Sequence, residues 1–314
     1  MSDAVADVNS PEPLGDSSDF EWLTVCSQLC CGPSRLLIVG RGVCRVLVRG
    51  FARRRCFVGA AVAAVLVLVA GCGGAGPRLR GHVAPPGAPH WDYAAAGPER
   101  WAELDRAYLT CRSGHEQSPV DLPSHTRLAP QEHIDIDYGS VPGLDLLHNG
   151  HTVQANVAAG NGNRLVVDGV DYELTQFHFH LPSEHTVDGA GAAMELHLVH
   201  RDAAGALAVL GVLLRAAAES SPLDPILAAA PATPGATAAV GGLDLRALLP
   251  ADLDQFRYRG SLTTPPCSEG VAWTVLEHPS TVGPASAERY RTLFPHSNRP
   301  TQPLYGRAVT LAGN

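Results

Sequence analysis

Three histidines stand in two short segments whose side chains alternate in character. His178 and His180 lie in residues 176–180, and His197 lies in residues 194–200. In a β-strand, side chains two residues apart point to the same face, so the first two imidazoles would lie side by side. If the two segments are neighbouring strands, the three imidazoles can converge on one point. Three histidine ligands with the fourth position open are the pattern of a catalytic zinc site.

Two further polar side chains share the faces of these histidines. Gln176 lies two residues before His178, and Glu195 lies two residues before His197. Histidines that bind a metal usually donate their second ring N–H to a carboxylate or carbonyl oxygen. We therefore expect Gln176 and Glu195 to support His178 and His197 in this way. The alternative is that both are ordinary polar residues on a strand face, and the shared spacing favours the supporting role.

Strand patterns outnumber helical ones in the second half of the chain. A hairpin is predicted where Asp168-Gly169 separates two short runs, and residues 206–214 and 271–277 are apolar runs of buried-strand length. Short helices are predicted at residues 100–108 and 284–293, and a loop at residues 181–193. We predict a mainly β fold: a single domain with a large, mostly antiparallel, twisted central sheet and peripheral short helices.

The composition excludes several classes of protein. The chain has 314 residues, 45% of them apolar, and all 23 of its basic residues are arginine. Without lysine, the chain has neither a Schiff-base lysine nor a Walker phosphate loop. The net charge is −8 and no basic stripe is present, so we expect no nucleic-acid partner.

The N-terminal part of the chain differs from the rest and predicts export. Residues 1–48 hold four of the eight cysteines, and we interpret them as a poorly structured leader, which a mis-assigned start of the gene would explain. Residues 49–72 join a basic stretch to an apolar run of about 15 residues, short of the ~20 that span a bilayer. The run ends in Ala70-Gly71-Cys72, which resembles a bacterial lipobox and implies a lipid on Cys72. A plain signal-anchor is the alternative.

A flexible tether is predicted at residues 73–89, which are rich in glycine, alanine and proline. One folded domain is predicted at residues 90–314. We expect this domain to lie outside the cytoplasm, in the cell envelope, held at the membrane by the lipid or by the signal segment. In such an oxidising compartment the two remaining cysteines, Cys111 and Cys267, are expected to form a disulfide. Two unpaired thiols are the alternative.

An ordered set of motifs resembles the α-class carbonic anhydrases, particularly their bacterial secreted members. The resemblance covers about residues 90–310, and the motifs follow the order of the family. Each motif is weak alone, and the ordered set is highly specific. The motifs are Trp91-x-Tyr93 with Gly97-Pro98-Glu99-x-Trp101, Gln117-Ser118-Pro119-Val120-Asp121, Asn149-Gly150-His151, Gln176-Phe177-His178-Phe179-His180, Ser183-Glu184-His185-Thr186-Val187, Glu195-Leu196-His197-Leu198-Val199-His200, Gly260-Ser261-Leu262-Thr263-Thr264-Pro265-Pro266 and Asn298-Arg299-Pro300-x-Gln302.

The resemblance implies a zinc-dependent hydration of CO₂ to bicarbonate and a proton. His178, His180 and His197 would bind Zn²⁺, which lowers the pKa of a bound water to about 7, the known value for this enzyme class. The hydroxide formed in this way would attack CO₂. Thr263 would accept a hydrogen bond from the hydroxide and donate its own to Glu184, which orients the nucleophile.

The resemblance also implies a route for the proton and a pocket for the substrate. His151 matches the proton shuttle, since a histidine near pKa ~6.5 exchanges protons at neutral pH, and Tyr93 matches the tyrosine that orders the water chain. CO₂ is uncharged and needs an apolar pocket beside the metal. The substrate pocket would be formed by Val199, Val209, Leu262, Thr264 and Trp273. Taken alone, His151 would be an exposed loop residue and the pocket residues would be core. Oligomeric state is left open between monomer and dimer.

Two other functions compete with this interpretation. In a cupin, the spacing from His178 and His180 to Glu184 would make the glutamate a ligand of iron or manganese. The other motifs of a cupin are missing, and His197 would be unexplained. In a non-catalytic binding module on the same scaffold, one or more ligand histidines are typically lost, whereas all three are present here.

Overall fold

The computed structural model describes residues 89–129 and 134–313. The predictions of a leader at residues 1–48, a signal segment with Cys72 at residues 49–72, and a tether at residues 73–89 fall outside the described residues, apart from Pro89. They stay predictions. No helix in the described ranges is long and apolar enough to cross a membrane.

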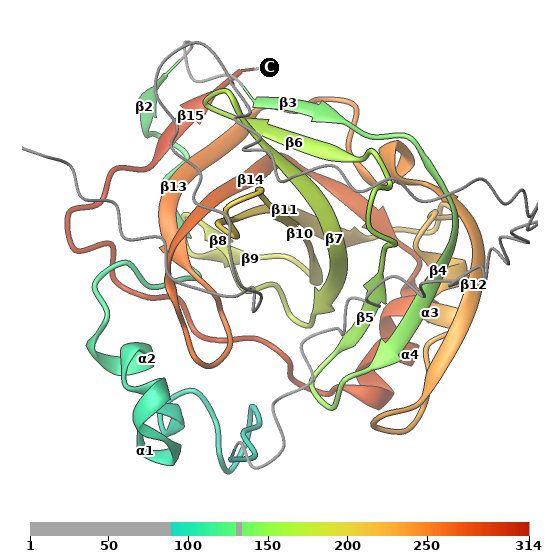
Figure 1. Cartoon of the computed structure of the whole chain (residues 1–314), viewed down its shortest axis with the longest axis horizontal. Coiled ribbons are helices and arrows are strands. Elements are labelled where there is room, and N and C mark those ends of the chain that lie inside the picture. The colour runs from blue at the N-terminus through green and yellow to red at the C-terminus, as the bar shows by residue number, and fades with distance from the viewer. Residues whose placement is uncertain (1–88, 130–133, 314) are drawn as a thin grey trace, which may run out of the picture. The chain divides into compact units, whose positions relative to one another are not determined.

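One large sheet of 12 strands forms the framework of the domain (Figure 1). Its main path runs β12-β4-β5-β7-β10-β11-β14-β13-β15-β2, and β6 pairs with both β7 and β3. Most neighbours are antiparallel, whereas β11 with β14 and β15 with β2 are parallel. Its strands are β2 (Arg127–Leu128), β3 (Ile134–Asp137), β4 (Ser140–His148), β5 (Val153–Asn156), β6 (Arg164–Val167), β7 (Val170–His180), β10 (Met194–Arg201), β11 (Leu207–Ala216), β12 (Thr237–Asp244), β13 (Gln255–Ser261), β14 (Glu269–Val282) and β15 (Thr310–Ala312).

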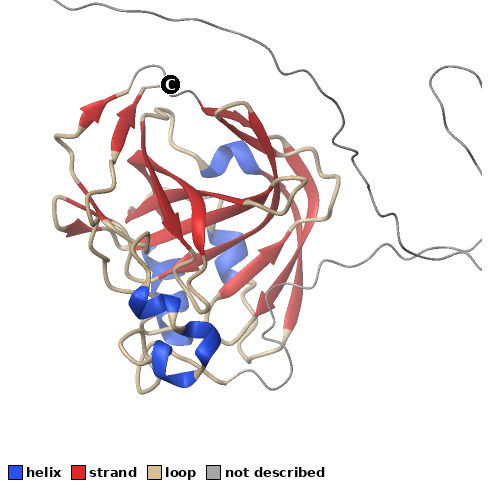
Figure 2. Cartoon of the chain, turned by 60° about the vertical axis from the view of Figure 1, so that its left-hand side comes forward, coloured by secondary structure: helices blue, strands red, loops and turns tan. Residues whose placement is uncertain are grey.

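The helices are short and lie at the periphery of the strands (Figure 2). They are α1 (Trp101–Leu104), α2 (Thr110–Ser113), α3 (Asp224–Ala228) and α4 (Pro284–Leu293), with 3₁₀ turns η1 (Arg106–Tyr108) and η2 (Leu245–Leu248). The predicted helix at residues 284–293 is confirmed and begins with a proline, which suits the first turn of a helix. The mainly β fold is therefore as predicted.

Two local predictions were wrong in detail. The helix expected at residues 100–108 is interrupted at Asp105, whose backbone is extended and whose side chain accepts the N–H of Ala107 to start η1. The loop expected at residues 181–193 contains β8 (Thr186–Val187) and β9 (Ala190–Gly191). Asp188 and Gly189 both have positive φ, which closes a tight turn, and these strands join β1 (Asp121–Leu122) in a small separate sheet.

The central strands bury both of their faces, which explains why they are apolar without interruption. In β11, Leu210 belongs to the main core, whereas its neighbour Val209 belongs to a second apolar cluster on the other face. In β14, Leu276 belongs to the main core and Trp273 belongs to the second apolar cluster. Strands buried on both faces lose the usual alternation of apolar and polar residues. The second cluster borders the site described next.

Candidate metal centre

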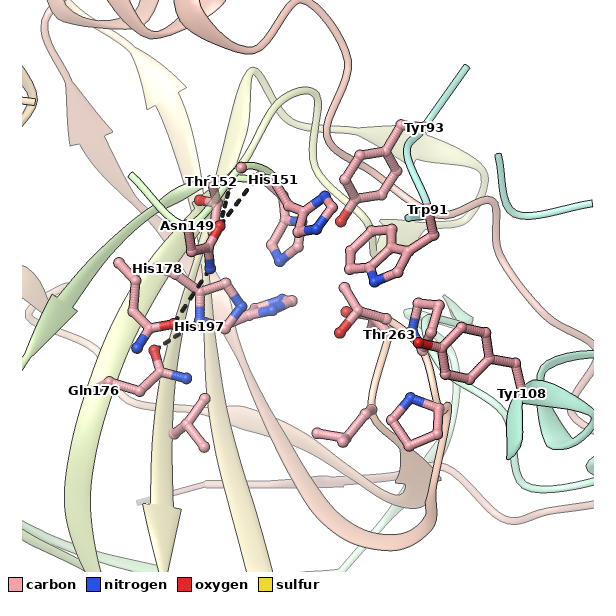
Figure 3. Close-up of a pocket in the computed structure, with 18 of the residues that line it drawn as sticks. Trp91, Tyr93, Tyr108, Asn149, His151, Thr152, Gln176, His178, His197 and Thr263 are labelled. Atoms are coloured by element: carbon pink, nitrogen blue, oxygen red, sulfur yellow. Dashed lines mark hydrogen bonds between the residues drawn. The ribbon is translucent and has the colours of Figure 1, made fainter. Parts of the chain in front are cut away.

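The three histidines converge because β7 and β10 are antiparallel neighbours. His178 on β7 lies directly opposite His197 on β10, and His180 lies opposite Glu195. One ring nitrogen from each histidine lies within 4.8 Å of the other two. Figure 3 shows His178 and His197 turned toward one another at the wall of a cavity. The predicted neighbouring strands and the predicted convergence of three imidazoles are therefore present.

Each histidine also has a hydrogen-bond partner on its second ring nitrogen. Nδ1 of His178 lies 2.9 Å from Oε1 of Gln176, and Nε2 of His197 lies 2.8 Å from Oε1 of Glu195. Nδ1 of His180 pairs with the carbonyl oxygen of Ser297. The partners of His178 and His197 are those expected from the two-residue spacing. Ser297 was missed, and the sequence gives no signal for a carbonyl that lies so far along the chain.

The electrostatics of the site favour neutral imidazoles, which are the form that binds a metal. Burial lowers the pKa of His180 to about 3, and it also lowers the pKa of His197. Nε2 of His180 is buried and has no hydrogen-bond partner among the described residues. A buried polar atom without a partner is costly unless something else binds it. A metal ion on the three histidines would satisfy this nitrogen.

Glu195 fixes the orientation of His197 through a buried network. Its Oε1 also pairs with Nδ1 of His185 at 2.7 Å, and its Oε2 accepts the backbone N–H groups of Glu184 and His185. Burial alone would raise the pKa of Glu195, but His185 and His197 outweigh this effect and hold it well below its usual value. The network continues from Nε2 of His185 to the hydroxyl of Tyr258. The part played by His185 and Tyr258 was not predicted, although His185 lies within a quoted motif.

Glu184 and Thr263 approach the metal centre from outside the two strands. Burial raises the pKa of Glu184 well above its usual value, and Glu195 adds to this. The N–H of Arg299, which donates to Oε1 at 2.7 Å, acts in the opposite direction, as do the hydroxyl of Thr263 and the guanidinium of Arg299. Oε2 of Glu184 has no hydrogen-bond partner of good geometry among the described residues, although the hydroxyl of Thr263 lies close enough to lower the pKa of the carboxyl. The predicted Thr263–Glu184 pair is nevertheless adjacent.

The histidines open into a cavity of about 770 Å³. Thr263 and all five residues predicted for the substrate pocket line it, namely Val199, Val209, Leu262, Thr264 and Trp273. Val199, Val209 and Trp273 are at the same time buried members of the second apolar cluster, with Leu262 packed against it. These residues are therefore part of the core and of the cavity wall at the same time, and their role in binding substrate stays a prediction. Tyr108 also lines the cavity and was missed (Figure 3).

His151 lines the cavity at a distance from the three histidines. Its ring stacks on Trp91, with centroids 3.6 Å apart and planes 6° apart (Figure 3). The side chain of Asn149 accepts the backbone N–H of His151 and fixes the turn. Burial, with a smaller contribution from the charge of His90, lowers the pKa of His151 to about 4. Tyr93 lines the same cavity, and burial raises its pKa well above the usual value, so its phenol stays protonated.

Comparison with known proteins identifies the family of this chain. A family model for eukaryotic-type carbonic anhydrase matches residues 96–312, which is more than half of the sequence. The chain belongs to this family. The prediction of an enzyme of the carbonic anhydrase family is thereby confirmed.

Several carbonic anhydrases resemble the chain over most of its length. The carbonic anhydrase of Klebsiella pneumoniae is 44% identical over 227 residues, which cover 71% of this chain and 91% of that protein. The carbonic anhydrase of Nostoc sp. is 40% identical over 227 residues, covering 70% and 85%. The structure of α-carbonic anhydrase from Thermovibrio ammonificans with the inhibitor sulfanilamide has a TM-score of 0.66 and 39% identity, and the match covers 71% of this chain and 100% of that one.

The predicted disulfide is present in this carbonic anhydrase fold. Cys111 in α2 is bonded to Cys267, with 5.0 Å between their Cα atoms. Cys267 follows directly after Pro265 and Pro266, which line the cavity. The guanidinium of Arg299 donates to the carbonyl of Cys111. The disulfide therefore joins the short N-terminal helices to the loop that carries Thr263.

The geometry argues against the cupin alternative. Oε1 of Glu184 lies 3.5 Å from Nδ1 of His180, which is the nitrogen that pairs with Ser297. Oε2 of Glu184 lies 3.9 Å from Nδ1 of His197. Among the described residues, the ligand atoms of His178, His180 and His197 converge within 4.8 Å of one another, and Glu184 is not in this group. His197 also lies in one group with His178 and His180, whereas a cupin would leave it unexplained.

Proposed function

We propose that the protein catalyses the reversible hydration of CO₂ to bicarbonate and a proton, with Zn²⁺ held by His178, His180 and His197. The observation that carries this proposal is the convergence of three imidazoles at the wall of a partly apolar cavity. The family and the names of the relatives support the reaction. The ligand set and the roles below are inferred from the chemistry of the residues.

The residues fit zinc. Zn²⁺ in catalytic sites takes three protein ligands and keeps a fourth position open. The donors here are three buried or half-buried imidazoles, and Nε2 of His180 lacks another partner among the described residues. When bound, the ion would supply a nucleophile at neutral pH by lowering the pKa of a coordinated water to about 7, the known value for this enzyme class.

Thr263 and Glu184 would orient the nucleophile. A carboxylate at Glu184 accepts a hydrogen bond from the hydroxyl of Thr263, so the threonine oxygen can only accept a hydrogen bond from the attacking oxygen. This requires ionised Glu184, although burial raises its pKa. A divalent ion on the nearby histidines would be the largest local positive charge and would favour the carboxylate. The N–H of Arg299 favours it as well.

The apolar wall would hold CO₂ beside the metal position. Val199, Val209 and Trp273 are held rigidly because they pack in the second apolar cluster. The indole N–H of Trp273 is bonded to the carbonyl of Ser261, so it is not offered to a ligand. An uncharged, linear substrate loses little on entering such a surface, whereas a charged product is bound less well.

His151 would carry the proton out of the cavity. Stacked on Trp91, its pKa of about 4 is too low for it to hold a proton at neutral pH. Rotation of the side chain into the water of the cavity would return the pKa toward its unperturbed value of about 6.5. The stacked position would therefore release the proton, and the position in water would collect it.

The experiment that tests this function is stopped-flow measurement of CO₂ hydration by the purified, zinc-loaded protein. We expect rapid acidification of an indicator that is abolished by a chelator and restored by Zn²⁺. A folded protein that contains zinc and gives only the uncatalysed rate would contradict the proposal. That result would instead favour the non-catalytic module.

We also propose that the protein is exported and held at the membrane by a lipid on Cys72. The basic and apolar segment at residues 49–72 supports this, and a disulfide within the folded domain suits an oxidising compartment. Expression in a bacterium with labelled palmitate should label the membrane fraction, and Cys72→Ser should lose the label. Retention of residues 1–71 in the mature protein would contradict the lipoprotein assignment.

A further inference from the structure

A second histidine lies beside His151 at the mouth of the cavity. His90 lines the same cavity, and its ring centroid is 6.0 Å from that of His151 with 24° between the planes. His151 is half-buried between its loop and Trp91, whereas His90 is exposed. The two rings therefore form a pair that leads from the inside of the cavity to the solvent.

We propose that His90 is a second proton relay, which takes the proton from His151 and passes it to bulk water. This inference rests on the proposed hydration of CO₂. Protonated His151 gives up one ring N–H proton, one bridging water carries it, and the neutral ring of His90 binds it. His90 then releases the same proton to water or buffer, so both rings return to their neutral state.

The other titratable groups around His151 cannot do this. His90, Asp92 and His148 are the groups whose charges act on His151. His148 is buried, and its Nδ1 accepts the N–H of Gly150, so it has no path to solvent. Oδ1 of Asp92 accepts the N–H groups of Ala94 and Ala96 and is committed to the turn. His90 is thus the exposed base of the three.

The stacking explains why a relay is useful. One face of the His151 ring is covered by Trp91, so a buffer molecule reaches that ring poorly. When His151 takes up the next proton from the cavity, repulsion between the two charged rings favours release of the earlier proton from His90. The exposed imidazole of His90 at the mouth of the cavity can be reached by buffer molecules from many directions.

The test compares His90→Gln with a matched control, His278→Gln. His278 is an exposed histidine paired with Asp252 and does not line the cavity. In weak buffer, His90→Gln should lower kcat several-fold, leave kcat/KM and zinc content unchanged, and recover when imidazole is added in excess. His278→Gln should behave as the unmodified protein. The double variant His90→Gln/His151→Ala should lose no more than His151→Ala alone, because the two residues act in series.

The outcomes separate the relay from the function on which it rests. If the unmodified protein hydrates CO₂ and His90→Gln keeps its full kcat in weak buffer, the relay is contradicted and the function stands. Additive losses in the double variant would also contradict a relay in series. If the unmodified, zinc-loaded protein has no hydration activity, the proposed function fails, and the relay fails with it.

Discussion

The two faces of β10 bury histidines of similar exposure in different surroundings. His197 faces the metal centre and is 1% exposed, whereas His200, three residues later, faces the main core and is 0% exposed. Burial lowers the pKa of both, in the case of His200 to about 3. His200 hydrogen-bonds through Nε2 to the hydroxyl of Tyr138 at 2.7 Å and lies apart from the other histidines of the site.

Burial and a perturbed pKa therefore do not by themselves identify a functional histidine. Both properties follow from any imidazole placed in an apolar core. What sets His197 apart is convergence with His178 and His180 and a carboxylate on its second nitrogen. Substitutions on the face of β10 that carries His197 should therefore abolish activity, whereas substitutions on the face that carries His200 should lower stability.

Removal of a ligand should have the largest effect. His197→Ala should lower kcat/KM for CO₂ hydration on the order of 10³-fold or more, because the metal and its nucleophile would be lost. Stopped-flow hydration at a temperature where the variants remain folded is the measurement. His200→Ala is the matched control and should retain activity. An equal loss of hydration activity in both variants would contradict the distinction between the two faces of β10.

Loss of the threonine hydroxyl should have the next largest effect. Thr263→Ala should lower kcat/KM by about 10²-fold, as expected for one preorganised hydrogen-bonding group at the reacting atoms. Thr263→Ser keeps the hydroxyl and should retain most of the activity. If the serine and alanine variants are equally impaired, Thr263 acts by shape alone and the orienting role is wrong.

The partner of His178 should affect metal affinity more than turnover. Gln176→Leu removes the 2.9 Å contact with Nδ1 and should weaken zinc binding by roughly 10-fold to 100-fold. Competition with a chromophoric chelator measures this. Gln154→Leu is the control, because Gln154 lines the same cavity but donates to Asn156 and not to a ligand. Similar losses in both variants would contradict the supporting role.

His200, the histidine in the core, should make the free energy of unfolding depend on pH. Its pKa falls from 6.5 in the unfolded chain to about 3 in the fold. Between these values the unfolded chain binds one more proton there, so stability decreases as pH falls. In His200→Gln, the slope of the unfolding free energy between about pH 4 and 6 should be smaller by about 1.4 kcal/mol per pH unit. Urea unfolding at several pH values tests this, and an unchanged slope would contradict it.

The sequence predicted the parts of the site that follow from strict alternation along a strand. His178 and His180, with Gln176 two residues earlier, needed only a period of two and a neighbouring strand. The thirteen residues between the two histidine strands are few enough to make β7 and β10 neighbours, and the structure pairs them. The helix at residues 284–293 was likewise predicted from local sequence signals.

Other features depend on contacts that leave no local signal. The carbonyl of Ser297 reaches His180 across 117 residues, and a carbonyl is common to every residue. The parallel pairing of β11 with β14 cannot be read from two apolar runs, because an apolar run carries no direction. The stacking of His151 on Trp91 and the pair it forms with His90 also depend on tertiary structure.

The metal content of two variants of the same strand tests the central claim most directly. The unmodified protein and His200→Ala, purified after expression with zinc, should each contain about one zinc per chain by elemental analysis, and His197→Ala should contain almost none. Tryptophan fluorescence would show that the purified variants are folded. Equal zinc in His197→Ala and His200→Ala, or iron or manganese in place of zinc in the unmodified protein, would contradict a metal centre built from His178, His180 and His197.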